Sequence, residues 1–330
     1  MSEHYDVAGI GNAIVDVIFA ASDDFLLKHN IAKGVMTLID EFRAVELIIA
    51  MNEARESSGG SAANTMAGLA SLGAKGAFIG KVKNDPLGTS FVNAMKSIGV
   101  HFTTPIAEHG SATACCVIAV TPDGQRSMST YLGASRELAP GDIELDTIAN
   151  AKVLYIEGYL WDAPVAKAAI RKAISAAKSG GSKVAFTLSD PFCVGRYRDE
   201  FLQLIKEDLD ILFANEEEAK ALFEAISFDE ALQHARAWPG LAVLTRSAKG
   251  CVIAAATGEV HVLDAEPVKK VVDTTGAGDQ FAAGFLGGFT RGLNLRDCGK
   301  LGGIAAAEVI SHYGARPETS LKALIERAGF

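Results

Sequence analysis

The sequence "VVDTTGAGDQFAAGFLGGF" (residues 271–289) is the most informative part of this chain. Three small residues, Gly276, Ala277 and Gly278, come directly before Asp279, at what the pattern predicts to be the first turn of a helix. A helix N-terminus exposes unpaired backbone N–H groups and carries roughly half a positive elementary charge. Glycines let a ligand approach such a backbone closely, so the stretch predicts an anion site beside a carboxylate.

The carboxylate of Asp279 has two interpretations on this pattern. It could accept the proton of a hydroxyl that attacks the γ-phosphate of ATP, while the amides of residues 276–278 stabilise the developing charge. Alternatively, it could only stabilise the helix dipole, because acidic residues favour first helical turns. The motif alone favours neither interpretation.

A second glycine-rich segment, "SSGGSAANTMAGLASLG" (57–73), predicts another helix start. Gly59 and Gly60 permit close approach of a small polar ligand, and Asn64 offers both donors and an acceptor. The plain alternative is a strand-to-helix turn in which Ser61 caps the helix.

A third segment, "ILFANEEEAKAL" (211–222), has Asn215 and Glu218 three residues apart at a predicted helix start, so they share a face. Oxygen ligands at that spacing suit Mg²⁺ held through water near phosphates. Taken alone, the segment favours a capping box with a solvated acidic turn.

Strand-like apolar runs alternate with helical patterns through most of the chain. The clearest predicted strands are 152–158, 183–189, 209–215 and 241–247, with helical segments such as 163–180 and 215–226 between them. Runs that are apolar on both faces and spaced by helices indicate a parallel sheet covered on both sides, which is an α/β fold.

Two regions break this alternation and predict a second, smaller sheet. Residues 12–42 and 111–133 contain short β-like runs without an intervening helix, and "TPDGQR" within the second region is a hairpin turn signal. We expect these two segments to form a small β lid over the acceptor site. The large core, with the ATP site and Asp279, would then comprise residues 1–11, 43–110 and 134–330.

Composition excludes several classes of function. The net charge of −9 argues against a nucleic-acid partner, which requires clustered positive charge. No apolar run approaches the ~18 residues needed to span a membrane, and the N-terminus lacks the pattern of a secretory signal. Five cysteines without metal-like spacing are typical of buried residues in a reducing compartment, so a cytoplasmic location is expected.

In this order, the segments resemble the PfkB (ribokinase-like) family of small-molecule kinases. Residues 59–88 resemble the family's N-terminal signature, "DTTGAGDQFAAGF" (273–285) its C-terminal signature, and "NEEE" (215–218) its N-x-x-E magnesium motif. The resemblance covers essentially the whole chain. It implies a three-layer α/β/α core with a small β-sheet lid, and ATP-dependent phosphoryl transfer with Asp279 as the base.

Within the family, "GIGNAIVDV" (9–17) and "QRSMSTYLGAS" (125–135) resemble segments of adenosine kinases. By that resemblance Asp16 would bind two ribose hydroxyls, and Arg126 would reach from the lid towards the transferred phosphate. The implied acceptor-site residues are Asp16, Gly59, Gly60, Ser61, Asn64 and Phe192. The implied ATP-site residues are Asn215, Thr245, Arg246, Ser247, Gly250 and Thr275.

The resemblance also implies cofactors. Asn215 and Glu218 would hold Mg²⁺ through water, and Asp273 with Thr275 would bind K⁺. The chain departs from the adenosine kinase pattern at Asp190, which stands where that pattern has alanine, and this allows a different acceptor.

A set of apolar residues is expected to face the acceptor. Each residue alone is more typical of core packing, but as a set they favour a flat apolar ligand. They are Phe19, Met36, Leu38, Leu132 and Phe192.

The expected reaction is phosphoryl transfer to the 5′-hydroxyl of a nucleoside, with adenosine as the first candidate. A kinase of a free sugar or sugar acid, such as ribose, fructose or 2-keto-3-deoxygluconate, is left open, because Asp16 serves ribose-type diols in either case. The intact Asp279 motif counts against a non-catalytic sensor, and a dinucleotide-binding fingerprint would need glycine at Ile14. The expected partners are ATP and a small molecule, and the protein would be a monomer or a homodimer.

Overall fold

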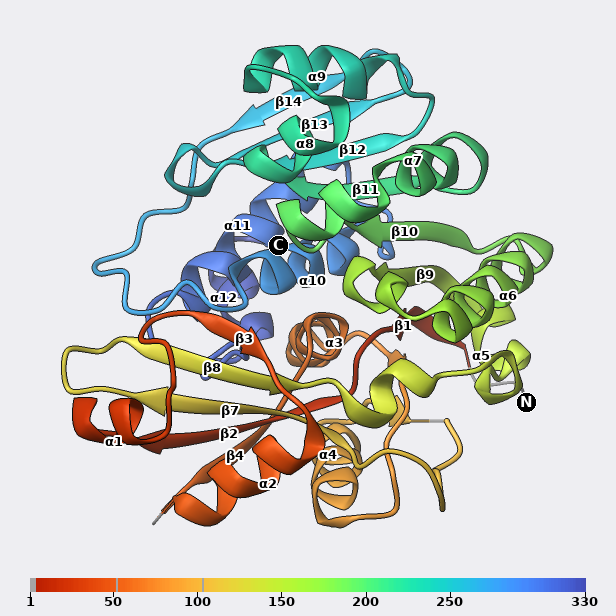
Figure 1. Ribbon diagram of the computed structural model, residues 1–330. Helices are drawn as coiled ribbons and strands as arrows, with labels where there is room; N and C mark the ends of the chain where they lie inside the picture. Colours follow the sequence, from red (N-terminus) through yellow and green to blue (C-terminus); the bar gives the residue numbers. More distant parts are fainter. Residues whose placement is uncertain (1–3, 52, 103) are drawn as a thin grey trace.

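The computed structural model describes residues 4–51, 53–102 and 104–330. The larger part of the molecule is built around one sheet with the strand order β14-β13-β12-β11-β10-β9-β1-β5-β6 (Figure 1). The strands are β1 (Tyr5–Ile10), β5 (Gly76–Ile79), β6 (His101–Phe102), β9 (Ala151–Glu157), β10 (Lys183–Thr187), β11 (Ile211–Asn215), β12 (Leu241–Thr245), β13 (Cys251–Ala255) and β14 (Val260–Leu263). In this sheet, each strand in the run β12-β11-β10-β9-β1-β5-β6 pairs in parallel with its neighbour. The strands β13 and β14 are antiparallel to their neighbours.

Helices cover both faces of this sheet, which explains its apolar strands. In β9, Leu154 and Ile156 pack into one core cluster, whereas Val153 and Tyr155 pack into the other. The first cluster is covered by α5 (Leu145–Ala149), α6 (Pro164–Gly180), α7 (Pro191–Glu207), α8 (Glu216–Phe223) and α9 (Phe228–Ala237). The second is covered by α3 (Ser61–Ser71), α4 (Pro86–Ser97), α10 (Ala277–Phe289) and α11 (Leu295–Val309), and α12 (Leu321–Arg327) packs on α11. The expected three-layer α/β/α core is confirmed.

Short 3-10 helices connect some of these elements. They are η1 (Gly133–Glu137), η2 (Pro140–Asp142), η3 (Gly158–Asp162) and η4 (Ser247–Lys249). The predicted strands match β9 to β12, although three of the predicted ranges run one or two residues past the observed C-terminal ends.

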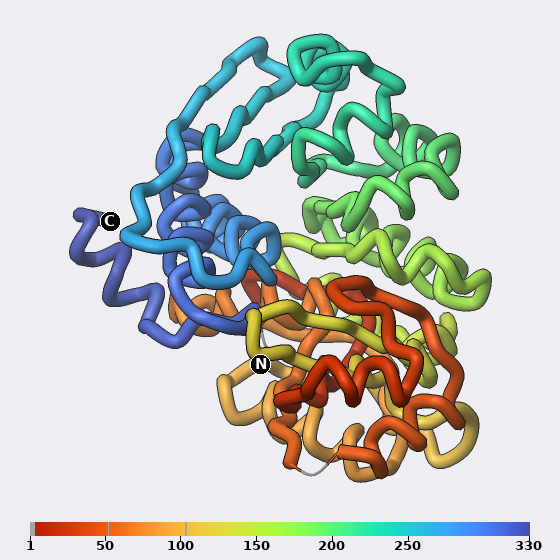
Figure 2. The backbone as a smooth tube through the Cα atoms, turned by 60° about the vertical axis from the view of Figure 1, so that its left-hand side comes forward, coloured from red at the N-terminus to blue at the C-terminus, as the bar shows by residue number. Residues whose placement is uncertain are grey.

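The second sheet has the strand order β3-β8-β7-β2-β4. Its strands are β2 (Ile14–Ala20), β3 (Met36–Leu38), β4 (Arg55–Gly59), β7 (Ala114–Val120) and β8 (Arg126–Tyr131). Figure 2 shows this small sheet and its helices as a lobe at one end of the larger layers. The hairpin at residues 121–126 is confirmed: β7 and β8 pair antiparallel, and Gly124 adopts a φ of 80°.

The strand pairing differs from the predicted division of the chain in two respects. Residues 43–110 were assigned to the core, but β4 lies within them and pairs with β2. Residues 12–42 were expected to lack a helix, but α1 (Asp23–Lys28) follows β2, with Ser22 capping it, and α2 (Glu41–Ala50) begins before the region ends. The polar run "RESSG" of β4 carries no apolar alternation, so only its partner strand reveals it.

The carboxyl ends of the parallel strands meet at one edge of the large sheet. Glu157 ends β9, Asn215 ends β11 and Thr245 ends β12, and Asn12 and Asp190 follow β1 and β10. In open α/β sheets this is the edge at which ligands bind. No helix in the described part of the chain is long and apolar enough to cross a membrane.

Candidate active site

The N-terminus of α10 presents free backbone donors. Gly276 is the N-cap residue with a φ of 77°, and an added Cβ there would approach Ala315 to 2.7 Å, so glycine is required by both conformation and space. Within the described residues, the amides of Gly276, Gly278 and Asp279 have no hydrogen-bond acceptor in the protein. The prediction of a free amide was wrong for Ala277, because its amide donates to the backbone oxygen of Thr274 at 3.2 Å in the turn before the helix. The Cβ position of Gly278 has no atom within 4 Å. An anion could therefore approach these donors directly.

Asp279 points from this helix start towards α3. Its Oδ1 accepts a hydrogen bond from Ser61 Oγ at 2.6 Å, and its Oδ2 accepts one from Asn64 Nδ2 at 3.1 Å. Burial raises the pKa of the Asp279 carboxyl, although the bonds from Ser61 and Asn64 and the charge of Arg316 act in the opposite direction. A raised pKa makes a carboxylate a stronger proton acceptor. The structure thus brings the two glycine-rich segments together at one carboxylate.

The N-terminus of α3 is arranged differently. Gly60 has a φ of 92°, and an added Cβ there would meet the backbone oxygen of Asn12 at 2.1 Å. Ser61 is the first residue of α3, so Gly60 is the N-cap residue, and a glycine has no side chain that could cap the helix. The amide of Ala62 donates instead to Glu157 Oε2 at 2.9 Å. The predicted cap by Ser61 is therefore absent, and Ser61 is available to Asp279.

Glu157 is a buried carboxylate that the sequence analysis did not identify. Asn12 Nδ2 donates to its Oε1 at 2.7 Å, and its side chain lies at the carboxyl edge of the large sheet. Burial raises the pKa of Glu157 to about 7, with a smaller contribution in the same direction from Asp279. A signal was present in the sequence, because this acid directly ends the apolar run of a buried strand.

Asp16 lies on the face of the small sheet opposite to its helices. Strand register places it beside Ser57 of β4 and Cys116 of β7, and the Cβ position of Gly59 is 2.7 Å from its Oδ2. Burial raises the pKa of Asp16 to about 6, against the opposing charges of Arg126 and Arg316. Side chains alternate along strands, so the residues that share this face follow from the register. They are Ile14, Ile18, Ala20, Met36, Leu38, Arg55, Ser57, Gly59, Ala114, Cys116, Ile118, Val120, Arg126, Met128 and Thr130.

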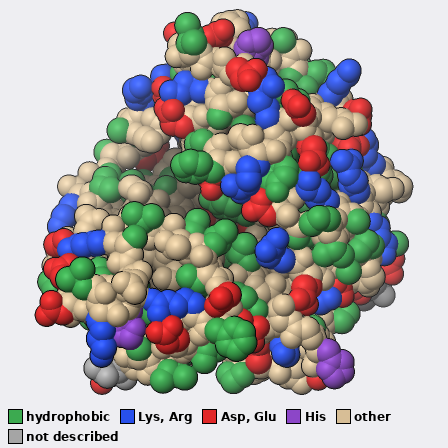
Figure 3. Space-filling view, in the orientation of Figure 1, with side chains coloured by type: hydrophobic (Ala, Val, Ile, Leu, Met, Phe, Trp, Pro, Cys, Tyr) green, Lys and Arg blue, Asp and Glu red, His purple; other side chains and the backbone are tan. Residues whose placement is uncertain are grey.

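This shared face is largely apolar, and it includes two of the residues expected there. Met36 and Leu38 of β3 pair with Met128 and Thr130 and so lie on the side of Asp16. The expectation for Phe19 was wrong, because it alternates to the opposite face and packs edge-on against Phe25, with ring centroids 5.2 Å apart. Figure 3 shows that the surface is hollowed between the small sheet and the upper part of the molecule.

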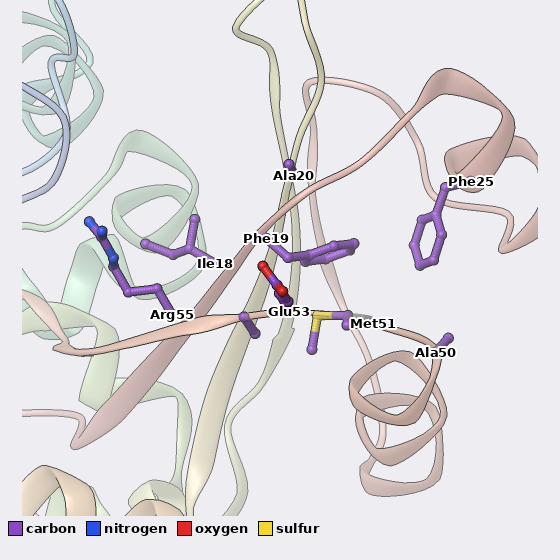
Figure 4. Close-up of a pocket in the computed structure, with 9 residues that line it drawn as sticks. Ile18, Phe19, Ala20, Phe25, Ala50, Met51, Glu53 and Arg55 are labelled. Carbon is purple, nitrogen blue, oxygen red and sulfur yellow. The ribbon is translucent and has the colours of Figure 1, made fainter.

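A separate pocket lies at the far end of β2. It has a volume of about 620 Å³, and Figure 4 shows Phe19, Phe25 and Met51 on one side of it and Ile18 and Arg55 on the other. Its lining includes neither Asp16 nor Asp279. This pocket is therefore not the predicted active site.

Phe192, expected in the acceptor site, is 79% exposed in the first turn of α7. Its neighbour Asp190 caps that helix by accepting from the Cys193 amide at 2.6 Å. Phe192 belongs to the α/β core and not to the small sheet, so strand register says nothing about its distance from Asp16. Its role as a substrate contact stays a prediction.

Arg126 reaches from β8 to the turn that precedes α10. Its Nη1 donates to Asp273 Oδ2, while its Nε is buried and has no acceptor among the described residues. Asp273 also accepts from the Thr275 amide and hydroxyl and from the Gly314 amide. A carboxylate has about four acceptor positions, so this side chain has none left for a K⁺ ion in this arrangement. The K⁺ site stays a prediction.

Asn215 and Glu218 form the capping box that their spacing allowed. Glu218 N donates to Asn215 Oδ1 at 2.9 Å, and Asn215 N and Nδ2 donate to the Glu218 carboxylate at 2.9 and 2.6 Å. Burial raises the pKa of Glu218 to about 7, and the nearby carboxylates Asp190 and Asp279 add to this shift. No group of three or more acidic, histidine or cysteine side chains in the described chain could hold a metal ion by itself.

The predicted ATP-site residues around β12 lie at the same sheet edge. Thr245 pairs in register with Asn215. Arg246 Nε donates to Glu216 Oε2 at 3.1 Å, and its guanidinium lies 3.9 Å from the ring centroid of Phe228. Gly250 has a φ of 78°, and a Cβ there would meet a backbone oxygen at 2.0 Å. Ser247 begins η4, and the contacts of all four residues with ATP stay predictions.

Two further residues of the site were not among the predicted site residues. Gln280 is buried, and its Nε2 donates at 2.9 Å to the backbone oxygens of both Asn64 and Ala315, which joins α10 to α3. Arg316, in the loop between α11 and α12, donates from Nε to Asn64 Oδ1 at 3.2 Å. Gln280 directly follows Asp279 in the C-terminal motif, which was a signal for it, whereas Arg316 lies in no pattern that indicates an active site.

Comparisons with known proteins show the family of this chain. A family model described as pfkB family carbohydrate kinase matches residues 33–322. The crystal structure of adenosine kinase from Sinorhizobium meliloti is 49% identical, covers 99% of this chain and 100% of that chain, and has a TM-score of 0.90. A probable sugar kinase from Rhizobium etli CFN 42 is 48% identical, covers 99% of both chains and also has a TM-score of 0.90.

A curated relative extends the range of acceptors. The 5-dehydro-2-deoxygluconokinase of Geobacillus kaustophilus is 30% identical over 281 residues, which is 82% of this chain and 83% of the relative. The names of the relatives thus include both nucleoside and sugar-acid kinases. The family match and these kinase relatives confirm the family and reaction type expected from the sequence: the chain belongs to the pfkB family of carbohydrate kinases, which are phosphotransferases with an alcohol group as acceptor.

Proposed function

We propose that this kinase transfers the γ-phosphoryl group of ATP to the 5′-hydroxyl of a nucleoside, with adenosine as the acceptor. One observation carries the proposal: Asp16 stands on a mostly apolar sheet face beside Ile18, Ile118 and Met128. An ionised carboxylate can accept hydrogen bonds from both hydroxyls of a ribose. A flat base attached to that ribose would then bury its apolar faces against the neighbouring side chains.

The likeness to the Sinorhizobium meliloti adenosine kinase supports this acceptor over almost the full chain. The 5-dehydro-2-deoxygluconokinase relative favours a second candidate, a sugar-acid acceptor. A sugar acid carries a carboxylate, which calls for a cation in the acceptor site. Of the two guanidinium groups that act on Asp16, Arg126 is assigned to the transferred phosphate, and Arg316 already donates to Asn64 and Ser58. This engagement favours the neutral nucleoside.

In the proposed reaction the acceptor hydroxyl oxygen bonds to the γ-phosphorus as the bond from that phosphorus to the β,γ-bridging oxygen of ATP breaks. Asp279 takes the proton of the hydroxyl, and ADP leaves. The free amides of Gly278 and Asp279 would stabilise the negative charge on the transferred group. Arg126, which reaches the turn before α10 from β8, would add a positive charge beside it.

Asn215 and Glu218 would hold Mg²⁺ through water. The carboxylates of Asp190, Glu218 and Asp279 lie near one another, which supports this fit. Burial is the main cause of the raised pKa of Glu218, and the charges of Asp190 and Asp279 add to it; a divalent cation would relieve that repulsion. A bound Mg²⁺ would supply charge neutralisation on the ATP phosphates.

The test is a coupled ADP-release assay with Mg-ATP and a panel of acceptors. The panel contains adenosine, 2′-deoxyadenosine, inosine, guanosine, cytidine, ribose, fructose, 2-keto-3-deoxygluconate and 5-dehydro-2-deoxygluconate. We expect turnover of adenosine at micromolar concentration. We also expect a kcat/KM about ten- to a hundredfold lower for 2′-deoxyadenosine, which lacks one hydroxyl bond to Asp16. Turnover of a sugar or sugar acid without turnover of adenosine would refute the nucleoside proposal while leaving phosphoryl transfer intact.

A further inference from the structure

Arg316 joins three parts of the molecule that are distant in sequence. It lies in the loop between α11 and α12, and its Nε donates to Asn64 Oδ1 of α3 at 3.2 Å. Its Nη1 donates to Ser58 Oγ of β4 at 2.6 Å, and its Nη2 lies 3.6 Å from Met95 Sδ of α4. The guanidinium is thus enclosed between the small sheet and the helices of the core.

This placement is costly for a cation. Burial lowers the pKa of Arg316 to about 10, against the fields of Asp16 and Asp279. The hydrogen bonds of its guanidinium go to neutral groups, and it forms no direct ion pair with the carboxylate of Asp16 or of Asp279. Burial of a charge in this manner lowers stability unless the surrounding groups compensate for it. The position therefore indicates a role beyond packing.

The contact with Asn64 determines which way that amide points. Because Arg316 Nε can only donate, it holds the oxygen of Asn64, and the NH₂ group of the same amide is turned towards Asp279 Oδ2. If the amide turned over, its oxygen would face the carboxylate, and its NH₂ group would face a guanidinium that cannot accept. Arg316 thus excludes the orientation that would repel Asp279.

We propose that Arg316 is a positioning residue for phosphoryl transfer, which acts through Asn64 to orient the carboxylate of Asp279. Its second bond, to Ser58 at the end of β4, ties the small sheet that carries Asp16 to the same amide. Arg316 thereby fixes the position of Asp16, which would bind the acceptor, relative to Asp279, which would accept its proton. This inference rests on the proposed role of Asp279 as the base.

A double-mutant cycle between Arg316 and Asn64 tests the proposal. Arg316→Met should lower kcat about ten- to a hundredfold, because small misplacements of a reacting group have effects of this size. The KM for ATP should change less than about twofold, since the arginine contacts no predicted ATP residue. In an Asn64→Ala background the same substitution should lower kcat by less than about threefold, because the amide through which it acts is gone.

Arg198→Met is the matched control. Arg198 is also partly buried and donates to a backbone oxygen, that of Leu222 at 2.8 Å, but it lies on α7, on the other side of the large sheet from α3. It should alter thermal stability without altering kcat. If Arg316→Met does not fold, Arg316→Lys carries the test, since it keeps the charge and one donor and should retain part of the activity.

The outcomes separate this inference from the proposed function. An unchanged kcat in Arg316→Met, or an equal loss in the wild-type and Asn64→Ala backgrounds, would overturn the positioning role. Full turnover by Asp279→Asn, measured in parallel, would instead refute the base itself.

Discussion

The two glycine-led helix starts, those of α3 and α10, look alike in sequence but are used differently. Each has an N-cap glycine with positive φ, Gly60 at 92° and Gly276 at 77°, and neither has a side-chain cap. At α3 the Ala62 amide is occupied by the carboxylate of Glu157 from the large sheet. At α10 the amides of Gly278 and Asp279 have no acceptor within the described residues.

The same local pattern is thus filled by a protein carboxylate at one helix and left open at the other. A helix N-terminus attracts negative charge in both cases. Where the fold supplies an internal carboxylate, the helix start is anchored and Ser61 and Asn64 remain available for Asp279. Where the fold supplies none, the donors have no acceptor among the described residues, and we propose that they bind a phosphate. Four substitutions test this contrast.

The largest effect is expected from Asp279→Asn. An amide of the same size keeps the helix start but cannot accept the proton of the acceptor hydroxyl, so kcat should fall ~10²- to 10⁴-fold. The binding affinity for the acceptor, measured by calorimetry, should change little. Turnover within a few-fold of the wild type would show that the carboxylate serves only the helix dipole.

The glycines of the two helix starts should respond in opposite ways to alanine. Gly278→Ala places a methyl group where no atom lies within 4 Å, so the fold should keep its melting temperature. The methyl group would crowd an anion at the free amides, and kcat should fall about tenfold or more. Gly60→Ala meets the Asn12 carbonyl at 2.1 Å and a φ of 92°, so it should lower the free energy of unfolding by ~3 kcal/mol.

Paired measurements of melting temperature and kcat check this contrast. A stable but inactive Gly278→Ala beside an unstable Gly60→Ala supports it. A Gly60→Ala variant as stable as the wild type, or a fully active Gly278→Ala variant, would contradict the use assigned to that helix start.

The smallest effect concerns the anchoring carboxylate and pH. Burial raises the pKa of Glu157 from its ordinary 4.5 to about 7, so between these values the folded protein holds a proton that the unfolded chain has lost. Stability is therefore lost as pH rises from ~4.5 to ~7, by an amount of order 3 kcal/mol at most for this residue. Glu157→Gln cannot ionise, so its free energy of unfolding should fall less between pH 5 and pH 8.

Urea unfolding at the two pH values measures this difference. Glu200→Gln is the control: burial alone would raise the pKa of Glu200, but the bonds from Lys167 and Trp161 bring it below the ordinary value. Glu200 is then ionised in both states across this range, and its replacement should leave the slope unchanged. An identical pH slope for the wild type and Glu157→Gln would show that Glu157 is ionised in the folded protein.

Much of the fold could be predicted because its strands are buried on both faces. The apolar runs that became β9 to β12 and the Asp-Gly hairpin of residues 121–126 are local signals. The strand β4 and the face on which Phe19 lies could not be predicted in the same way. A polar edge strand such as "RESSG" depends on its partner, and the face of a residue depends on register.

The residues of the candidate site also divide into those with a local sequence signal and those that depend on distant contacts. The residues whose chemistry is local could be predicted: the glycines that begin two helices, Asp279 in a first turn, and the Asn215–Glu218 cap. Local backbone geometry and hydrogen bonding within four residues specify all of these. Tertiary structure alone decided that Asp279 meets Ser61 and Asn64, more than 200 residues away, and that Glu157 fills one helix start. It also decided that Arg316 orients the amide of Asn64, because contacts between distant segments follow from packing, which no local pattern encodes.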